Sequence, residues 1–363
     1  MVDAEQRIRE LEDELKKTIY NKATQHHIGL VKAKIAKLRE AVIKKASGGK
    51  KGEGYAVKKS GDASVILIGF PSVGKSTLLN KLTKAESRVG TYDFTTLTVI
   101  PGLMEYKNAK IQVLDVPGIV HGAASGKGRG KEVLAVMRSA DMAVILLDVS
   151  HSGHLKALQK EIFDTGVRIN QQPPDIKIVK KTRGGMTVAS TLKLTHIDEE
   201  TIRAVMAEYR LLNADIVIRE NITVDQLIDV LEGNRVYMPA VVVINKMDLA
   251  SPTRLEELRK NLKPDMCIAA EKNVGIEALR DIIYERLRFI RIHTKEVGKK
   301  ADMDVPLIMR EGCTVKDVCE KLHRDFAQKF RFARVWGSAK FPGQKLALGY
   351  KVKDKDIVEV HVR

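Results

Sequence analysis

The chain has 363 residues, of which 44% are hydrophobic and 30% are charged. At roughly 150 residues per domain, this length predicts two to three domains with buried cores, and the composition excludes a wholly disordered, collagen-like or coiled-coil protein. The formal net charge is +17. Such a surplus favours polyanions such as RNA as partners, and the alternative is a basic surface that is merely solvated.

Cysteine usage and the apolar runs bear on the compartment. Cys267, Cys313 and Cys319 are too few for a disulfide framework, and none lies in a C-x-x-C pair, which favours a reducing compartment over secretion or a zinc site. The charged opening MVDAEQRIREL lacks the apolar run of a secretory signal, and the longest apolar segments have the length of buried strands. We therefore expect a soluble, cytoplasmic protein with no membrane contact and no DNA partner.

The first 47 residues carry apolar side chains at three- and four-residue steps with Lys and Arg between them, which predicts helix. A polar stretch at 21–27 could divide this helix into a hairpin. The Gly- and Lys-rich stretch at 46–54 is typical of a linker.

From Ala63 the pattern changes to short apolar runs separated by amphipathic segments. The runs are nearly continuous, as expected for parallel strands covered on both faces: SVILIGF, KIQVLDV, MAVILLDVS and PAVVVINKM. We therefore expect a doubly wound α/β domain. About ninety residues separate the third run from the fourth, too many for one crossover. They predict a small α+β insertion at 168–237 with a helix from Glu199 to Leu211.

A helix near 276–292 is expected to precede a C-terminal domain. Its pattern of strand, helix, strand and strand is typical of a β-grasp module. The predicted division of the chain is a helical hairpin with its linker at 1–60, the first part of the α/β domain at 61–167, the insertion at 168–237, the second part of the α/β domain at 238–294, and the C-terminal domain at 295–363.

A complete G-x-x-x-x-G-K-S motif at 69–76 follows the first apolar run and opens a helix. This context strongly predicts a P-loop, because its glycines let the backbone wrap phosphates against the N–H groups of a helix N-terminus. Lys75 is expected to reach the β- and γ-phosphates and to act in catalysis, and Ser76 to supply an oxygen to Mg²⁺. The predicted nucleotide-binding residues in this region are Gly69, Pro71, Ser72, Val73, Gly74, Lys75, Ser76 and Thr77.

The segment Asn-Lys-Met-Asp at the end of the last apolar run predicts the base. The Asp248 carboxylate can accept both guanine N1–H and the exocyclic N2–H₂, whereas adenine offers no such donor pair. We expect Asn245 to tie this segment to the P-loop and the Lys246 stem to cover the base. Further on, IAAEKNVG is similar to a last guanine-binding loop. There Ala269 stands where Ser is usual, and the Ala270 N–H is expected to meet the base oxygen.

Two further segments predict contacts with Mg²⁺ and the γ-phosphate. Asp115 ends the second apolar run and is expected to hold Mg²⁺ through water, while Gly118 offers its N–H to the γ-phosphate. Upstream, YDFTTL carries adjacent hydroxyls. Of these we favour Thr96 over Thr95 to complete the Mg²⁺ shell when the γ-phosphate is present, although for either alone an ordinary strand residue is the alternative.

Ile119 occupies the position where many GTPases keep a glutamine that orients the attacking water. An isoleucine cannot do this, so the water must be held by backbone, another side chain, an ion or a partner. The glycine-rich segment that follows carries Lys127, Arg129 and Lys131. These cations could sense the γ-phosphate or touch a polyanion, and the alternative is a flexible solvated loop.

Taken together, GFPSVGKST, YDFTTLT, LDVPGI with GAASGKGRG, and NKMD resemble the developmentally regulated GTP-binding proteins among the Obg-like GTPases. The resemblance runs over essentially the whole chain. It implies a helical N-terminal domain, a GTPase domain, an insertion like a ribosomal-protein fold and a C-terminal TGS domain. It further implies slow GTP hydrolysis and association with translating ribosomes. Several relatives are stimulated by K⁺, but the P-loop asparagine that binds it elsewhere is Ser72 here.

The sequence therefore predicts a Mg²⁺-dependent GTPase that acts as a ribosome- or RNA-associated switch in translation, with GTP or GDP as ligand, K⁺ as a conceivable activator and a regulatory protein as a conceivable partner. Two alternatives stay open. One is a GTP-gated RNA-binding scaffold with negligible turnover, which Ile119 favours, and the other is a ribosome-assembly factor.

Overall fold

The computed structural model describes residues 2–19, 21–22, 24–46, 61–83, 100–115, 136–150 and 153–363. The chain divides into two compact units. The first comprises Met1–Gly54, Ala124–Gly128 and Ile162–Tyr237, and the second comprises Tyr55–Ala123, Arg129–Glu161 and Met238–Arg363. Among the helices of the described residues, none is both long enough and apolar enough to span a bilayer.

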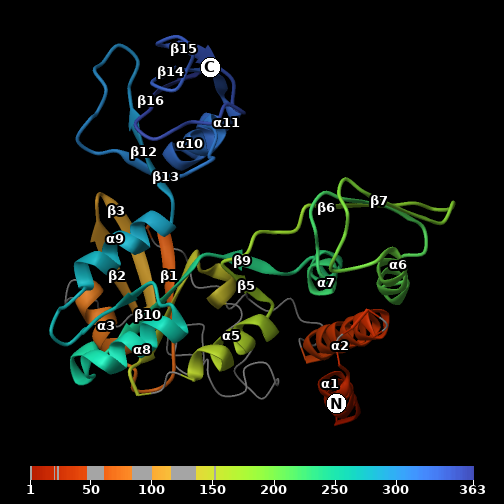
Figure 1. Cartoon of the computed structure of the whole chain (residues 1–363). Helices are drawn as coiled ribbons and strands as arrows, with labels where there is room; N and C mark the ends of the chain where they lie inside the picture. Colours follow the sequence, from red (N-terminus) through yellow and green to blue (C-terminus); the bar gives the residue numbers. More distant parts are fainter. Residues whose placement is uncertain are drawn as a thin grey trace. The chain divides into compact units, whose positions relative to one another are not determined.

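The second unit contains a six-stranded sheet with strand order β11-β10-β4-β1-β3-β2 (Figure 1). Neighbouring strands are parallel except for β2, which is antiparallel to β3 at one edge. The strands are β1 (Ala63–Ile68), β2 (Ile100–Tyr106), β3 (Ala109–Asp115), β4 (Met142–Asp148), β10 (Ala240–Asn245) and β11 (Met266–Cys267). The expected α/β class is confirmed, and the four apolar runs form β1, β3, β4 and β10.

Helices cover both faces of this sheet. Leu78 and Leu79 of α3 and Leu279 of α9 share one buried cluster with the strands, whereas Leu258 of α8 packs with Ile244 on the other face. This double cover explains why every residue of β1 and β4 is buried. The helices are α3 (Lys75–Leu82), α5 (His154–Asp164), which crosses the boundary between the units, α8 (Pro252–Leu262) and α9 (Ile276–Arg286), with a 3-10 helix η1 at Met247–Leu249.

The C-terminal part of the second unit is a five-stranded mixed sheet with strand order β13-β12-β16-β14-β15. Its elements are β12 (Phe289–Thr294), β13 (Leu307–Arg310), α10 (Val315–Leu322), α11 (Arg324–Gln328), β14 (Phe330–Trp336), β15 (Gln344–Leu346) and β16 (Ile357–Val362). The helix α9 is shorter than the one expected at 276–292. It ends at Arg286, and the alternating residues from Phe289 pair with β13 and β16 instead.

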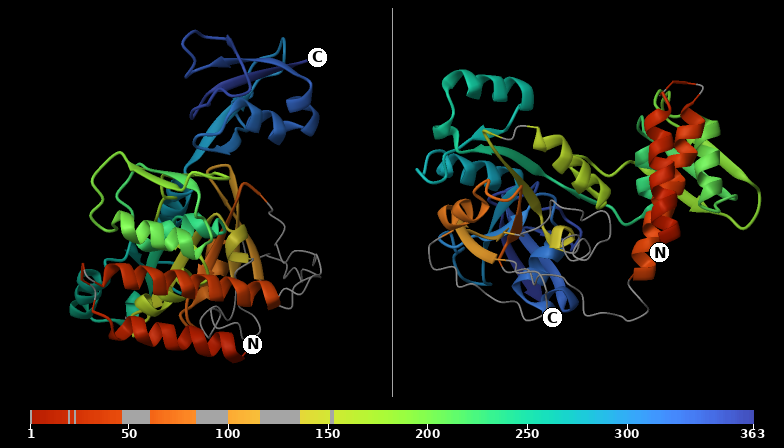
Figure 2. Two further views of the ribbon diagram at one scale, coloured as in Figure 1. Left: turned by 90° about the vertical axis from the view of Figure 1, so that its right-hand side faces the viewer. Right: turned by 90° about the horizontal axis from the view of Figure 1, so that it is seen from below.

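The first unit begins with two helices, α1 (Val2–Lys17) and α2 (Gln25–Ala46), which lie side by side in Figure 2. The break between the helices, at 18–24, overlaps the polar stretch expected at 21–27. Leu11, Val31 and Ile35 form the buried contact between the helices. Ala33, on α2, is buried in the core of the insertion. The N-terminal hairpin and the insertion therefore share one core.

The insertion packs helices against a three-stranded sheet with strand order β6-β8-β7. The elements of this layer are β6 (Ile176–Lys180), β7 (Met186–Ser190), α6 (Glu199–Glu208), β8 (Ala214–Ile218) and α7 (Val224–Glu232). Two further strands, β5 (Val167–Ile169) and β9 (Val236–Met238), pair with each other in a separate sheet. The helix expected to reach Leu211 ends at Glu208. The strands β5, β8 and β9 were not expected from the sequence.

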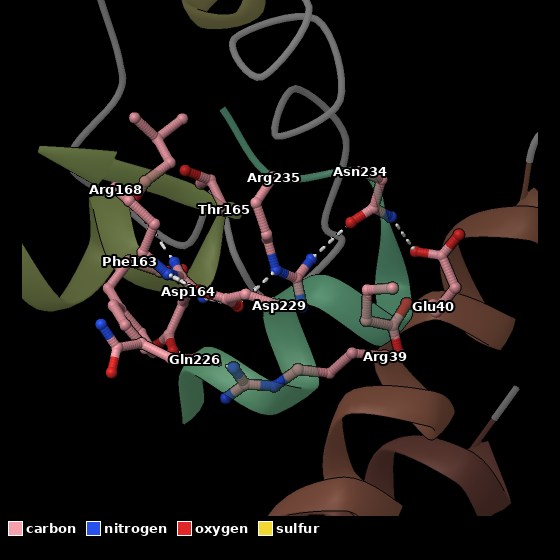
Figure 3. A network of polar contacts seen from close by, with 12 residues as sticks. Arg39, Glu40, Phe163, Asp164, Thr165, Arg168, Gln226, Asp229, Asn234 and Arg235 are labelled. Carbon is pink, nitrogen blue, oxygen red and sulfur yellow. Dashed lines mark hydrogen bonds and ion pairs between the residues drawn. The ribbon is translucent and has the colours of Figure 1, made fainter. Parts of the chain in front are cut away.

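A buried ion pair holds the base of the insertion together (Figure 3). The Arg168 guanidinium donates two hydrogen bonds to Asp229, of 2.6 and 2.7 Å, and both side chains are 3% exposed. Arg235 donates a third bond to the same carboxylate at 3.0 Å. The Phe163 ring lies 3.6 Å from the Arg168 guanidinium carbon. A buried charge that has lost its partner is costly in free energy, so the fold is stable only when Arg168 and Asp229 are paired.

Replacing Arg168 with Met should therefore lower the free energy of unfolding by about 3–5 kcal/mol, since it leaves the Asp229 carboxylate buried with only part of its pairing. Urea denaturation followed by circular dichroism measures the change. The matched control is Arg7→Met, which breaks the exposed pair of Arg7 with Glu10. It should cost no more than about 0.5 kcal/mol. Equal losses in the two variants would contradict this account.

Candidate nucleotide-binding site

The loop at 69–74 joins the buried strand β1 to the start of α3. Gly74 has a φ of 94°, which favours glycine, and a Cβ there would lie 2.4 Å from the side-chain nitrogen of Asn245. Gly69 has no room for a side chain either, because its Cβ would lie 2.5 Å from the Leu146 carbonyl oxygen. Both glycines of the motif are therefore required by close approach within the protein.

The N-terminus of α3 is suited to an anion. Within the described residues, Gly74 provides no side-chain cap, and the first turn carries no acidic residue. The first N–H groups of a helix lack intrahelical partners and carry a partial positive charge, so a phosphate at this end would be stabilised.

Lys75 lies at the first position of α3, and its ammonium folds back onto the loop. It donates hydrogen bonds to the carbonyl oxygens of Gly69 at 3.0 Å and Phe70 at 2.9 Å. Burial lowers the pKa of Lys75, and the charge of Asp115 opposes this shift in part. A phosphate group would favour the charged form and replace the carbonyl contacts, so the lysine is held close to where an anion would bind.

Ser76 and Asp115 form the polar pair beneath the loop. The Ser76 hydroxyl donates to Asp115 Oδ2 at 2.8 Å. Asp115 is 4% exposed, and within the described part of the chain its Oδ1 is buried without a hydrogen-bond partner. Such an orphaned oxygen is expensive unless a ligand satisfies it. A hydroxyl beside a carboxylate is an oxygen donor set of the kind that Mg²⁺ takes, so these residues fit the ion.

Asn245 connects three loops through one buried amide. Its nitrogen donates to the Val73 carbonyl oxygen at 2.9 Å, and its oxygen accepts from the Ala270 N–H at 3.0 Å. The side chain thus ties the end of β10 to the P-loop, as expected, and also to the loop after β11. The Ala270 N–H that we expected at the base oxygen is engaged with Asn245 here, and its role toward the base stays a prediction.

Lys246 and Asp248 belong to the same segment and follow the end of β10. Lys246 has a φ of 61°, and its ammonium donates to the Ser72 carbonyl oxygen at 2.7 Å. Asp248 lies in η1, where its carboxylate pairs with Lys272 at 3.0 Å. The hydrogen bond from Lys272 lowers the pKa of Asp248, so the carboxylate is ionised at neutral pH.

The structure brings most of the predicted site residues to the carboxyl edge of the parallel strands. They are Gly69, Pro71, Ser72, Val73, Gly74, Lys75, Ser76, Thr77, Asp115, Asn245, Lys246, Asp248, Ala269 and Ala270. Parallel strands end at one edge, so strand order alone explains this convergence. Thr95, Thr96, Gly118 and Ile119 lie outside the described residues, as do Lys127, Arg129 and Lys131.

Two contacts at this site were not expected from the sequence. Lys272 pairs with Asp248, although it lies 24 positions further along the chain. The ring of His154 lies 4.0 Å from that of Phe70, a loop residue. Nothing in the spacing of either residue signals the contact, because each pair is joined only when the strands align.

Family models match three parts of the chain. Residues 64–181 match "50S ribosome-binding GTPase", residues 183–289 match the C-terminal region of that domain, and residues 290–362 match the TGS domain. The GTPase and TGS domains implied by the resemblance are thereby confirmed.

Similar proteins occur in distant organisms. An uncharacterized GTP-binding protein of Methanocaldococcus jannaschii is 56% identical over 99% of this chain and 93% of its own. Developmentally-regulated G-protein 3 of Arabidopsis thaliana is 45% identical over 98% of both chains. Among solved structures, the Schizosaccharomyces pombe YchF GTPase covers 84% of this chain and 99% of its own, at 11% identity and a TM-score of 0.43. Since the first two relatives are 56% and 45% identical to it over nearly its full length, the chain belongs to the family of developmentally regulated GTP-binding proteins and is a GTPase.

Proposed function

We propose that this GTPase requires Mg²⁺, hydrolyses GTP slowly, and acts in translation as a switch whose nucleotide state controls its association with ribosomal RNA. The observation that carries the nucleotide part is the convergence of Lys75, Asp115 and Asn245 at one edge of a parallel sheet, where each is hydrogen-bonded to the P-loop or to the first turn of α3. The RNA part rests on the basic charge and on the ribosome-binding family model.

Base selection falls to Asp248 in this proposal. Its carboxylate is ionised and lies just after Asn245, whose two hydrogen bonds fix where the segment leaves β10. Lys272 occupies one carboxylate oxygen and would keep the group in place until guanine donates to it. A carboxylate that accepts two donors from one base discriminates strongly, because a base without them leaves it unpaired.

Replacing Asp248 with Asn should weaken GTP binding by at least about tenfold and raise the affinity for xanthosine triphosphate, because an amide can donate to the xanthine oxygen. Competition between labelled GTP and xanthosine triphosphate measures the ratio. The control is Glu256→Gln, the same chemical change on the exposed side of α8. An Asp248→Asn protein with unchanged GTP preference would show that another group reads the base.

Ser76 and Asp115 are the described residues that would hold Mg²⁺, with Thr96 as the proposed third. The ion, when bound, neutralises charge on the β- and γ-phosphates. The chain's own part is to hold these oxygens ready. The hydrogen bond from Ser76 orients the Asp115 carboxylate, and burial at the end of β3 excludes bulk water from it.

Lys75 supplies the remaining charge at the phosphates. Phosphoryl transfer needs charge neutralisation and an aligned water, and little covalent help. The first need, charge neutralisation, is met by the P-loop lysine, the helix N-terminus and the proposed Gly118 N–H. The Ile119 side chain cannot meet the second need, the aligned water, since it has no group that accepts or donates a hydrogen bond.

Intrinsic turnover should therefore be slow, on the order of 10⁻⁴ to 10⁻² s⁻¹. Lys75→Ala should abolish hydrolysis, Ile119→Ala should change it little, and Lys81→Ala, on the same helix, is the matched control. Single-turnover assays in Na⁺ and in K⁺, with and without ribosomes, measure these rates. Fast hydrolysis in Na⁺ alone, or a large loss on Ile119→Ala, would contradict the proposal, and no turnover with ribosomes would favour the non-hydrolysing scaffold.

A net charge of +17 supports an RNA partner, because cations that contact phosphates release counterions. The family model described as ribosome-binding supports the same partner and a role in translation. Deletion of the N-terminal helices is not a clean test, since Ala33 belongs to the core of the insertion. The full chain is therefore the object to test.

The full chain should co-sediment with ribosomes more tightly in a non-hydrolysable GTP analogue than in GDP. Its affinity should fall by on the order of 10³ between about 50 and 200 mM salt if six or more phosphates are contacted. GTP affinity over the same salt range is the control. Binding that ignores salt would point to a protein partner, and binding only to free subunits would favour the assembly factor.

A further inference from the structure

The five-stranded sheet of the C-terminal part has two unlike faces. One face, with Ala333, Val335 and Val358, is buried against Val315 and Val318 of α10. The opposite face carries the alternate residues of the same strands, and among the described residues no helix shares a core cluster with it. We call it the open face and define it by Lys295, Phe332, Arg334, Trp336, Lys345 and His361.

Aromatic rings on the open face lie beside cations. The rings of Phe332 and His361 are stacked, with centroids 4.3 Å apart and planes 21° from parallel. The ammonium of Lys345 lies 4.7 Å from the centre of the Phe332 ring, and that of Lys295 lies 5.2 Å from the centre of the Trp336 ring. Flat rings flanked by cations can accept both stacked bases and phosphates.

One buried carboxylate lies among these cations. Glu359 is 2% exposed and bonds to both Lys295 and His361. Burial raises the pKa of Glu359, but the hydrogen bonds from Lys295 and His361 outweigh burial, and the pKa lies below its ordinary value. Arg334 also lies within ion-pair distance of this carboxylate, at 4.0 Å. One carboxylate cannot neutralise Lys295 together with the two outer cations, Arg334 and Lys345, so the open face keeps a surplus of positive charge.

These outer cations lie opposite each other. Arg334 on β14 pairs in register with Lys345 on β15, and both are exposed to solvent. Like charges directly opposite across a ladder destabilise a sheet. Glu359, opposite Arg334 on β16, offsets this repulsion in part. A polyanion that lies across β14 and β15 would offset the rest.

We propose that the open face binds unpaired RNA, with bases stacked on its rings and the backbone along Arg334 and Lys345. This rests on the proposed association with RNA and names where and how it occurs. Double-stranded RNA offers phosphates but no free base faces, so it cannot use the rings. An acidic peptide would use only the cations.

Fluorescence anisotropy of the full chain with a labelled unstructured RNA of about twelve nucleotides, and with the same RNA annealed to its complement, tests the proposal. Phe332→Leu keeps an apolar side chain but removes the ring, and should weaken single-strand binding roughly tenfold while changing duplex binding little. Arg334→Gln with Lys345→Gln should lower the slope of log affinity against log salt by about 1.4, because two phosphate contacts are lost.

The charge-matched control is Lys316→Gln with Lys329→Gln, which removes two exposed cations from α10 and from the end of α11. It should leave single-strand affinity within about twofold, since those side chains lie on the elements that cover the other face. Removing Arg334 also removes its ion pair with Glu359, so the thermal midpoint of each variant is measured beside its affinity. Weaker binding at an unchanged midpoint reports lost contacts and not lost folding.

If the wild-type protein binds RNA but the open-face variants bind it as well as the control variant does, this inference is overturned and the proposed function is not. Equal affinity for the single strand and the duplex, or displacement by polyglutamate as efficient as by RNA, would also overturn it. Absence of any RNA binding by the wild-type chain would instead overturn the proposed function on which it rests.

Discussion

The buried amide of Asn245 is the contact on which the site depends. Its nitrogen holds the P-loop at Val73 and its oxygen holds the loop at Ala270, so one side chain fixes both loops against the end of β10. Each partner is a backbone group that would be costly to leave unpaired in a buried place. Gly74 approaches so closely that any side chain would displace this amide. The P-loop and the Asn-Lys-Met-Asp segment are therefore parts of one hydrogen-bonded unit.

Around this unit, several polar groups are held in contacts that a nucleotide would replace. Lys75 donates to carbonyl oxygens of its own loop, Lys272 pairs with Asp248, and Ser76 pairs with Asp115. Each contact satisfies a charge or a dipole within the protein. Among these described groups, the Asp115 Oδ1 atom is buried without a hydrogen-bond partner. The site is thus largely preformed, which reduces the ordering that binding requires.

Both units have apolar cores, and the first adds a buried ion pair. The α/β sheet is buried on both faces by apolar side chains, so hydrophobic contact dominates there. At the base of the insertion, by contrast, Arg168 and Asp229 are buried as an ion pair. A buried pair adds little stability relative to apolar residues but penalises any arrangement that separates it. We infer that the pair selects one packing of α7 against the segment that follows α5.

The sequence alone located the P-loop motif, the Asn-Lys-Met-Asp segment and the parallel strands, because each depends on local constraints: glycines that allow close approach, a lysine at a helix start, and apolar runs of strand length. Its errors fell on short segments, where β8 was missed and β12 was read as helix, since six apolar-rich residues satisfy either period. Only the tertiary structure decided that Lys272 meets Asp248, that Asn245 bridges two loops, and that Ala33 joins the core of the insertion. These contacts join residues distant in the chain, and they exist only because strand order and register bring the residues together.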